Sequence, residues 1–176
     1  NAGFNCLTPR VLVTSKSWAQ RDEFMTALED VLASLPTRRA YYPGASARHA
    51  SFLAEYPAAR TIGSAGDGEL PWTLIRDVDP TQTNAMAFNV EAFCSLTAET
   101  ALEAADPADF VRRAVAFCND VVWGTLSATL IAHPSTLKDP TTGAAIEQAI
   151  ADLRYGSIGV NLWRSEEQTS ELQSRG

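Results

Sequence analysis

The chain is short of the residues that bind nucleic acids and anionic membranes. Its 14 lysines and arginines are outnumbered by 21 aspartates and glutamates, which gives a formal net charge of −7, and there is no basic run. A surface of this charge repels phosphates, so the sequence argues against nucleic acid or a membrane as the main partner. No apolar run approaches the ~20 residues that a membrane-spanning helix requires. With 45% apolar and 20% charged residues, the composition is that of an ordinary globular domain.

Cysteine and histidine are also scarce. The three cysteines (Cys6, Cys94 and Cys118) are odd in number and far apart, and the histidines are His49 and His133. This spacing matches neither a disulfide framework nor a metal site, so we predict that the protein binds no metal. Thiols without a disulfide framework fit a reducing compartment, and we therefore expect a cytoplasmic protein.

The hydrophobic pattern alternates between strand-like and helix-like periods. β-branched apolar runs followed by polar turns predict strands, and apolar residues at helical spacing predict helices. Together they predict an α/β fold with a largely parallel, twisted sheet flanked by helices. The expected strands span 10–14, 72–76, 126–132 and 157–162, the expected helices span 19–34, 46–56, 106–122 and 142–153, and residues 88–96 mix turn and strand.

The first of these helices has a single apolar stripe, which we expect to face the core. Its charged residues, Arg21 among them, should face elsewhere. The stripe consists of Phe24, Leu28, Val31, Leu32 and Leu35.

Residues 164–176 break the alternating pattern. The segment from Arg164 is polar, has no apolar face and begins abruptly after Trp163. It resembles the conceptual translation of a common sequencing adapter, from which it differs at Gln168. We therefore expect a non-native tail over 164–176, which is excluded from the fold. The alternative is a natural polar tail.

The strongest chemical signal lies at Cys6. This cysteine follows Gly3 by three residues and precedes the apolar segment at residues 10–14. Glycine accepts a positive φ and permits close approach, so the spacing suits a nucleophile carried on a tight turn. Although most cysteines are small buried hydrophobic residues, a thiolate on such a turn can attack an electrophilic carbon. Cys6 is therefore a candidate nucleophile.

Several segments, Cys6 included, together resemble the aldehyde dehydrogenase superfamily. The family's active-site pattern is Asn, any residue, Gly, usually Gln, any residue and the nucleophile Cys, followed by a short apolar strand. Glu91-Ala92-Phe93 is similar to its Glu-x-Phe element. The matches occur in the family's order and cover residues 1–163. The matching segments are residues 1–6, 10–13, 91–93, 123–128 and 153–161.

This resemblance implies an oxidoreductase that oxidises a small-molecule aldehyde with NAD or NADP. It assigns Cys6 as the nucleophile that forms a thiohemiacetal and then a thioester. It also assigns Glu91 to the nicotinamide ribose and Phe93 to the neighbourhood of the nicotinamide ring. The parent protein is expected to be a homo-oligomer.

The resemblance further implies that residues 1–163 are part of a catalytic domain that is incomplete at both ends. In the family, the dinucleotide-binding domain, an oxyanion-binding asparagine and a glutamate base precede the nucleophile, and here they would lie before residue 1. The 176-residue chain alone is therefore expected to be inactive.

The sequence departs from the family pattern at several sites, including Thr8-Pro9, which shortens the stretch between Cys6 and Arg10. Phe4 stands where glutamine is usual, and Cys94-Ser95 replaces the usual Gly-Pro after Glu-x-Phe. These differences indicate a divergent branch. They leave open the aldehyde, the choice between NAD and NADP, and whether water or coenzyme A accepts the acyl group. We expect Cys94 to be a packed core residue.

Two other functions stand as alternatives. A thiol acyltransferase or hydrolase would pair Cys6 with a histidine, and a non-catalytic interaction domain would keep the fold without the reaction. We expect His49 on the surface of a helix and His133 in a turn before Pro134, and neither context indicates a base oriented by a third group. Dependence on a nicotinamide cofactor separates the dehydrogenase from the hydrolase.

Overall fold

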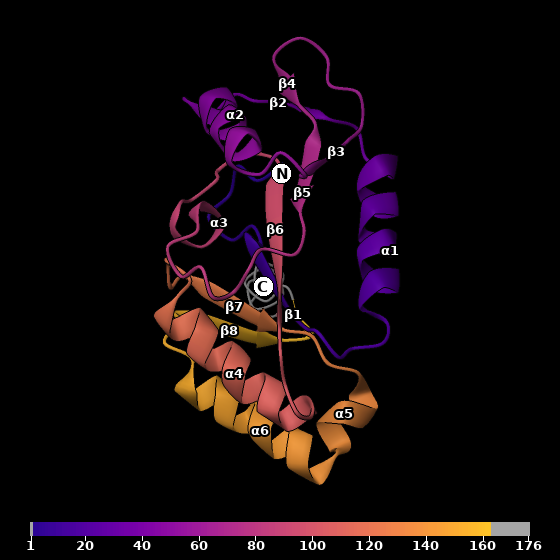
Figure 1. Cartoon of the computed structure of the whole chain (residues 1–176), viewed down its shortest axis with the longest axis vertical. Helices are drawn as coiled ribbons and strands as arrows, with labels where there is room; N and C mark the ends of the chain where they lie inside the picture. Colours follow the sequence, from indigo (N-terminus) through magenta and orange to yellow (C-terminus); the bar gives the residue numbers. More distant parts are fainter. Residues whose placement is uncertain (1, 163–176) are drawn as a thin grey trace, which may run out of the picture. The chain divides into compact units, whose positions relative to one another are not determined.

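The computed structural model of the chain describes residues 2–162, which divide into two compact units (Figure 1). Unit 1 consists of the residues up to Ala104 together with Val121–Trp123. Unit 2 consists of Ala105–Asp120 and the residues from Gly124 onward. The polar tail expected over 164–176 lies outside the described residues.

Unit 1 is built on a four-stranded sheet in the order β1-β6-β5-β3. β1 and β5 both pair with β6 in parallel, which confirms the largely parallel sheet, whereas β3 is antiparallel to β5. The chain returns from β3 to β5 without a crossover helix, and only an antiparallel pair can be joined in that way. The bounds are β1 Val11–Ser15, β3 Arg60–Ile62, β5 Trp72–Ile75 and β6 Leu96–Leu102, and a separate antiparallel ribbon pairs β2 Arg38–Arg39 with β4 Glu69–Leu70.

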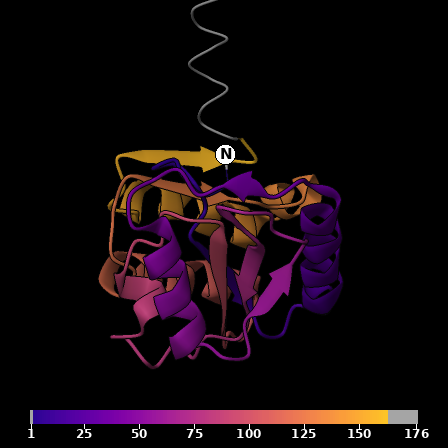
Figure 2. The ribbon, with the colours of Figure 1, turned by 90° about the horizontal axis from the view of Figure 1, so that it is seen from above.

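Two helices lie on opposite faces of this sheet (Figure 2). Successive side chains of a strand point to opposite faces. Thr73 pairs with Leu96, and Glu99 lies three residues further along β6, so Thr73 and Glu99 face opposite ways. His49 of α2 forms a hydrogen bond with the Thr73 side chain, and Arg21 of α1 donates a hydrogen bond to the Glu99 carboxylate. The helices of unit 1 are α1 Arg21–Ser34, α2 Ala45–Glu55 and the short α3 Met86–Asn89.

The expected inner stripe of α1 is right at Leu28 and Leu32 and wrong at its other three positions. Phe24 is 37% exposed, Val31 56% and Leu35 45%, whereas Met25 is completely buried. The inward face instead follows positions 21, 25, 28 and 32, one helical stripe that begins with Arg21. Arg21 turns inward because a buried carboxylate on the sheet accepts its guanidinium.

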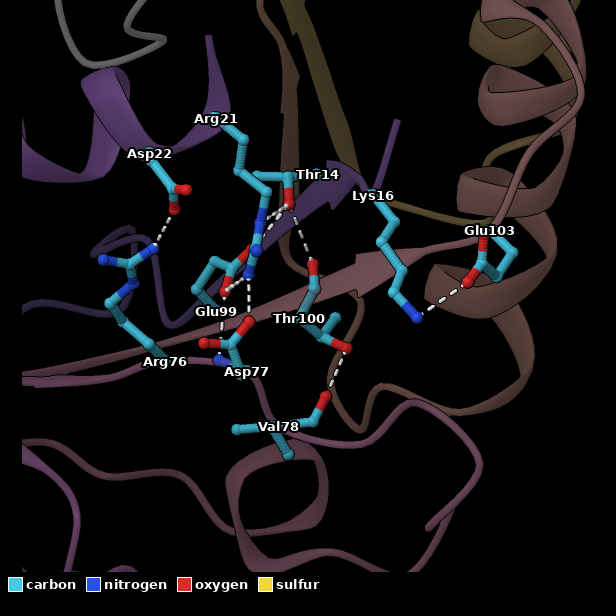
Figure 3. Close-up of polar contacts among 10 residues, drawn as sticks. All are labelled: Thr14, Lys16, Arg21, Asp22, Arg76, Asp77, Val78, Glu99, Thr100 and Glu103. Atoms are coloured by element: carbon cyan, nitrogen blue, oxygen red, sulfur yellow. Dashed lines mark hydrogen bonds and ion pairs between the residues drawn. The ribbon is translucent and has the colours of Figure 1, made fainter. Parts of the chain in front are cut away.

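The central strand β6 carries that carboxylate (Figure 3). Glu99 is fully buried and accepts hydrogen bonds from Arg21 Nε at 2.9 Å, Arg21 Nη2 at 2.7 Å, Thr14 Oγ1 at 2.5 Å and the backbone N–H of Asp77 at 3.1 Å. Arg21 also donates to the Asp77 carboxylate at 2.5 Å. A buried charge is tolerated when it is paired and hydrogen-bonded in this way. The cluster therefore ties α1, β1 and the end of β5 to β6.

Unit 2 contains helices and a two-stranded parallel sheet. Asp106 caps the first of these helices by accepting the N–H of Asp109 at 2.8 Å, and Asp139 caps another by accepting the N–H of Thr142 at 2.7 Å. Asn161 exchanges two hydrogen bonds with the backbone of Ala132. The expected helices and strands of this unit are present with shifted ends. They are α4 Pro107–Asp120, β7 Ser127–Leu130, α6 Pro140–Asp152 and β8 Ser157–Val160. The short helix α5 Pro134–Lys138 is not predicted by the sequence.

Candidate active site

Cys6 lies on an exposed turn that leads into β1. Ala2 and Gly3 both have positive φ, at 56° and 77°. The Asn5 side chain accepts the N–H of Leu7 at 2.7 Å, and the Asn5 carbonyl accepts the N–H of Thr8 at 3.1 Å. These local bonds close the turn around Cys6 and leave its side chain in solvent.

The backbone N–H of Cys6 is free for an incoming group. Within residues 2–162 it donates no hydrogen bond, whereas the N–H groups of Leu7 and Thr8, which follow it, are both bonded to Asn5. An unpaired N–H next to a thiol is the kind of donor that stabilises an oxyanion formed on that thiol's adduct. The turn thus combines an exposed thiol with a backbone N–H that is unpaired within residues 2–162.

The turn packs directly against the segment that contains Glu91 and Phe93. A Cβ placed on Gly3 would lie only 1.9 Å from the carbonyl oxygen of Cys94, so only glycine permits this approach. Glu91 is exposed and Phe93 is half-buried. The structure therefore brings together, within unit 1, the two segments that the sequence singled out.

Glu91 has an exposed carboxylate, and Phe93 has an unusual backbone conformation. Within residues 2–162 the Glu91 carboxylate makes no hydrogen bond or ion pair, so it is open to a ligand's hydroxyl groups. Phe93 has a positive φ of 41°, which residues other than glycine rarely adopt. Its ring packs on that of Tyr42, with centroids 4.4 Å apart. Within the described residues, this loop therefore combines an exposed carboxylate without a hydrogen bond and an aromatic ring that packs on Tyr42.

Sequence reasoning missed two residues next to this loop, Tyr42 and Arg48. Arg48 of α2 donates hydrogen bonds to the carbonyls of Ala92 and Phe93. The available signal was the Tyr41-Tyr42-Pro43-Gly44 turn, which places two aromatic rings immediately before α2. The Tyr41 ring packs on that of Phe4, with centroids 4.9 Å apart. Tyr41 therefore contacts the Cys6 turn, and Tyr42 contacts the Glu91–Phe93 loop.

The two histidines form hydrogen bonds with residues other than Cys6. His49 is buried, not on the helix surface as expected, and its Nε2 lies 2.8 Å from Thr73 Oγ1. Burial lowers the pKa of His49, which favours a neutral imidazole in the core. His133 caps α5, with Nδ1 2.7 Å from Ser135 Oγ. Neither imidazole is hydrogen-bonded to Cys6 within the described part of the chain.

The described residues contain neither a metal site nor a membrane-spanning helix. No group of three or more histidine, cysteine, aspartate or glutamate side chains in residues 2–162 is placed to hold a metal ion. None of the helices in that range has the length and apolar character needed to cross a bilayer.

The three thiols should differ sharply in reactivity. Burial raises the pKa of Cys94 to about 11, an effect that the nearby charge of Arg48 opposes, and burial raises the pKa of Cys118 to about 11. A thiol with that pKa is ionised at pH 8 in about one molecule in a thousand, and the thiolate is the reactive form. Cys94 is also only 1% exposed, as expected of a core residue. We therefore expect iodoacetamide at pH 8 to modify Cys6 at least about tenfold faster than the other two.

Peptide mapping by mass spectrometry measures the three rates in the folded chain. In denaturant the three cysteines should react at similar rates. Modification of Cys94 or Cys118 in the folded chain as fast as Cys6 would contradict the expectation.

Comparison with solved structures identifies the fold as that of the aldehyde dehydrogenase catalytic domain. A Mycobacterium tuberculosis aldehyde dehydrogenase complexed with NAD+ is 18% identical over 92% of this chain, with a TM-score of 0.69. Lactaldehyde dehydrogenase from Escherichia coli gives the same three values. Succinate-semialdehyde dehydrogenase from Burkholderia pseudomallei is 20% identical over 91% of the chain, with a TM-score of 0.65. The chain spans 33% of each of these proteins. No protein-family model and no curated protein matches the sequence.

Proposed function

We propose that residues 1–163 are part of the catalytic domain of an NAD(P)+-dependent aldehyde dehydrogenase in which Cys6 is the nucleophile. The observation that carries the proposal is the contact between the Cys6 turn and the Glu91–Phe93 loop, made possible by Gly3. The exposed thiol of Cys6, the Gly3–Cys94 contact next to Phe93, and a fold that aldehyde dehydrogenases share support the proposal.

The proposed reaction begins at Cys6. The Cys6 thiolate adds to the aldehyde carbon, the carbonyl π bond breaks, and the oxyanion of the resulting thiohemiacetal accepts the free N–H of Cys6. When bound, NAD(P)+ supplies the acceptor for the hydride that leaves this carbon, and a thioester then remains on Cys6. Attack on the thioester by water or coenzyme A releases the acyl group and restores the thiol.

The residues fit the cofactor in chemistry. The Glu91 carboxylate accepts hydrogen bonds, which suits the two hydroxyls of the nicotinamide ribose, and the Phe93 ring offers an apolar wall. Residues 2–162 contain no glycine-rich loop between a strand and a helix of the kind that binds a dinucleotide pyrophosphate. Gly63, Gly66 and Gly68 lie instead in the loop between β3 and β4. We therefore propose that the 176-residue chain alone does not turn over.

The proposal extends to the setting of the protein. All three cysteines are free thiols, which supports a reducing, cytoplasmic location. The likeness to aldehyde dehydrogenases supports a small-molecule aldehyde as substrate and a homo-oligomeric parent protein.

The test is a cofactor-reduction assay on the full-length protein that carries this chain. Absorbance at the wavelength of reduced nicotinamide should rise only when NAD+ or NADP+ and an aldehyde are both present. The matched control is the isolated 176-residue chain, which should give no signal with the same aldehydes. Acyl transfer without any cofactor reduction would establish the thiol acyltransferase or hydrolase instead, and no reaction of either kind would indicate a non-catalytic domain.

A further inference from the structure

The side chain of Arg48 in α2 is hydrogen-bonded to the backbone of the Glu91–Cys94 loop. Arg48 Nε donates to the carbonyl of Ala92 at 2.9 Å, and Nη2 donates to the carbonyl of Phe93 at 3.2 Å. The third nitrogen, Nη1, donates to the carbonyl of Pro43 at 3.0 Å. The guanidinium thus joins two consecutive carbonyls of the loop to the start of its own helix.

Only an arginine can make this set of bonds. Its five N–H donors lie in one fixed plane, whereas the lysine ammonium is a compact point charge on a flexible stem. The group also fits closely, because a Cβ at Gly44 would lie 2.9 Å from Nη1. The Arg48 charge lies 5.9 Å from the centre of the Tyr42 ring, and that ring packs on Phe93. The loop is therefore held through both its backbone and its aromatic side chain.

The loop needs such support because its conformation is unfavourable. Phe93 has φ at 41°, a left-handed value that an aromatic residue keeps only when its surroundings enforce it. Strained backbone of this kind concentrates at functional sites. On the other side of the loop, the carbonyl of Cys94 touches Gly3 in the Cys6 turn. The loop is thus fixed between Arg48 and the nucleophile's turn.

We propose that Arg48 is a positioning residue, which keeps the Glu91 carboxylate and the Phe93 ring in place beside the Cys6 turn and so preforms the cofactor side of the site. The hydrogen bonds of Arg48 support its role in holding the loop, and the consequence for the cofactor rests on the proposed dehydrogenase function. Arg48 itself touches neither reacting atom.

The chain carries its own reporter of the loop's position. Cys94 ends the loop and is 1% exposed, whereas Cys118 lies in unit 2 and reports loss of structure that extends beyond unit 1. The variant Arg48→Lys keeps the positive charge near Cys94, so a change in the Cys94 rate reflects access to the thiol. A local release of the loop should raise the alkylation rate of Cys94 alone.

Arg10→Lys is the matched control. Arg10 also donates to two backbone carbonyls, those of Phe88 and Trp123, and its charge lies 5.9 Å from the Trp123 ring. We expect Arg48→Lys to speed iodoacetamide modification of Cys94 at least tenfold while Cys118 stays within twofold, and Arg10→Lys to leave Cys94 within twofold. Equal increases at Cys94 and Cys118, or no increase at Cys94, would overturn the proposal.

A second measurement addresses the cofactor. In the full-length protein, Arg48→Lys should raise the KM for NAD(P)+ at least tenfold and change kcat less than threefold, because the nucleophile and its turn are intact. A residue with only a structural role would lower the melting temperature without this separation. An unchanged KM would refute the cofactor part. If the unaltered protein shows no dehydrogenase activity, the proposed function fails, and the Cys94 rates still decide whether Arg48 positions the loop.

Discussion

Aldehyde-dependent reduction of NAD(P)+ should disappear when Cys6 is replaced by alanine in the full-length protein. In the proposed mechanism the Cys6 thiolate forms the covalent bond on which the rest of the reaction depends, and loss of a covalent nucleophile lowers kcat by about 10⁴-fold or more. Neither of the other cysteines of this chain is suited to replace it, because Cys94 is 1% exposed and burial raises its pKa to about 11. Cys118 lies in the other unit, and burial raises its pKa as well.

The assay for Cys6→Ala needs two control measurements. Cys118→Ala should keep kcat within twofold, which separates loss of the nucleophile from loss of any cysteine. Binding of NAD(P)H to Cys6→Ala, followed by the fluorescence of its reduced nicotinamide, should stay close to that of the unaltered protein because the Glu91–Phe93 loop is untouched. If Cys6→Ala retained more than a tenth of the activity, Cys6 would not be the nucleophile.

Arg21→Met should lower the free energy of unfolding by about 3–5 kcal/mol, because it leaves a fully buried carboxylate without its charged partner. Glu99 would keep only Thr14 and the N–H of Asp77 as donors. Since domains are stable by about 5–15 kcal/mol in total, the variant should be close to unfolding. Urea denaturation followed by circular dichroism measures the difference.

Lys16→Met is the control for the buried pair. Lys16 and Glu103 also form an ion pair in unit 1, at 2.7 Å, but their side chains are 61% and 75% exposed (Figure 3). An exposed pair contributes about 0–1 kcal/mol, so this variant should change the stability little. The double variant Arg21→Met with Glu99→Leu should recover part of the loss, because it removes both charges from the core. A loss below about 1 kcal/mol for Arg21→Met would show that Glu99 does not depend on Arg21.

The sequence predicts those parts of the molecule whose signals are local. β-branched runs mark β1 and β5, the Asp106-Pro107 pair marks the start of α4, and each is present in the structure. Cys6 and Glu91–Phe93 were linked by resemblance alone, and the contact at Gly3 now gives that link a physical basis. What they do chemically stays a prediction until it is tested.

The parts that the sequence does not predict depend on partners far away in the chain. β6 was missed because its polar residues, Thr97, Glu99 and Thr100, interrupt the apolar pattern of a buried strand. Those residues are satisfied only by Arg21, Thr14 and other groups that the fold brings to them. His49 was expected at the surface for the same reason, since its partner Thr73 lies on a strand 24 positions away. Arg48 acts on backbone carbonyls, which no sequence pattern distinguishes.

The contact between Gly3 and Cys94 also has a consequence for the order in which the protein folds. The two residues lie near opposite ends of unit 1's sequence, and they meet only when β1 has paired with β6, whose register joins Val11 to Ala98. Pairing across so long a stretch costs chain entropy before any contact is gained, and it is slow compared with helix formation. The arrangement around Cys6 therefore depends on a long-range strand pairing, and we expect it to form no earlier than the pairing of β1 with β6.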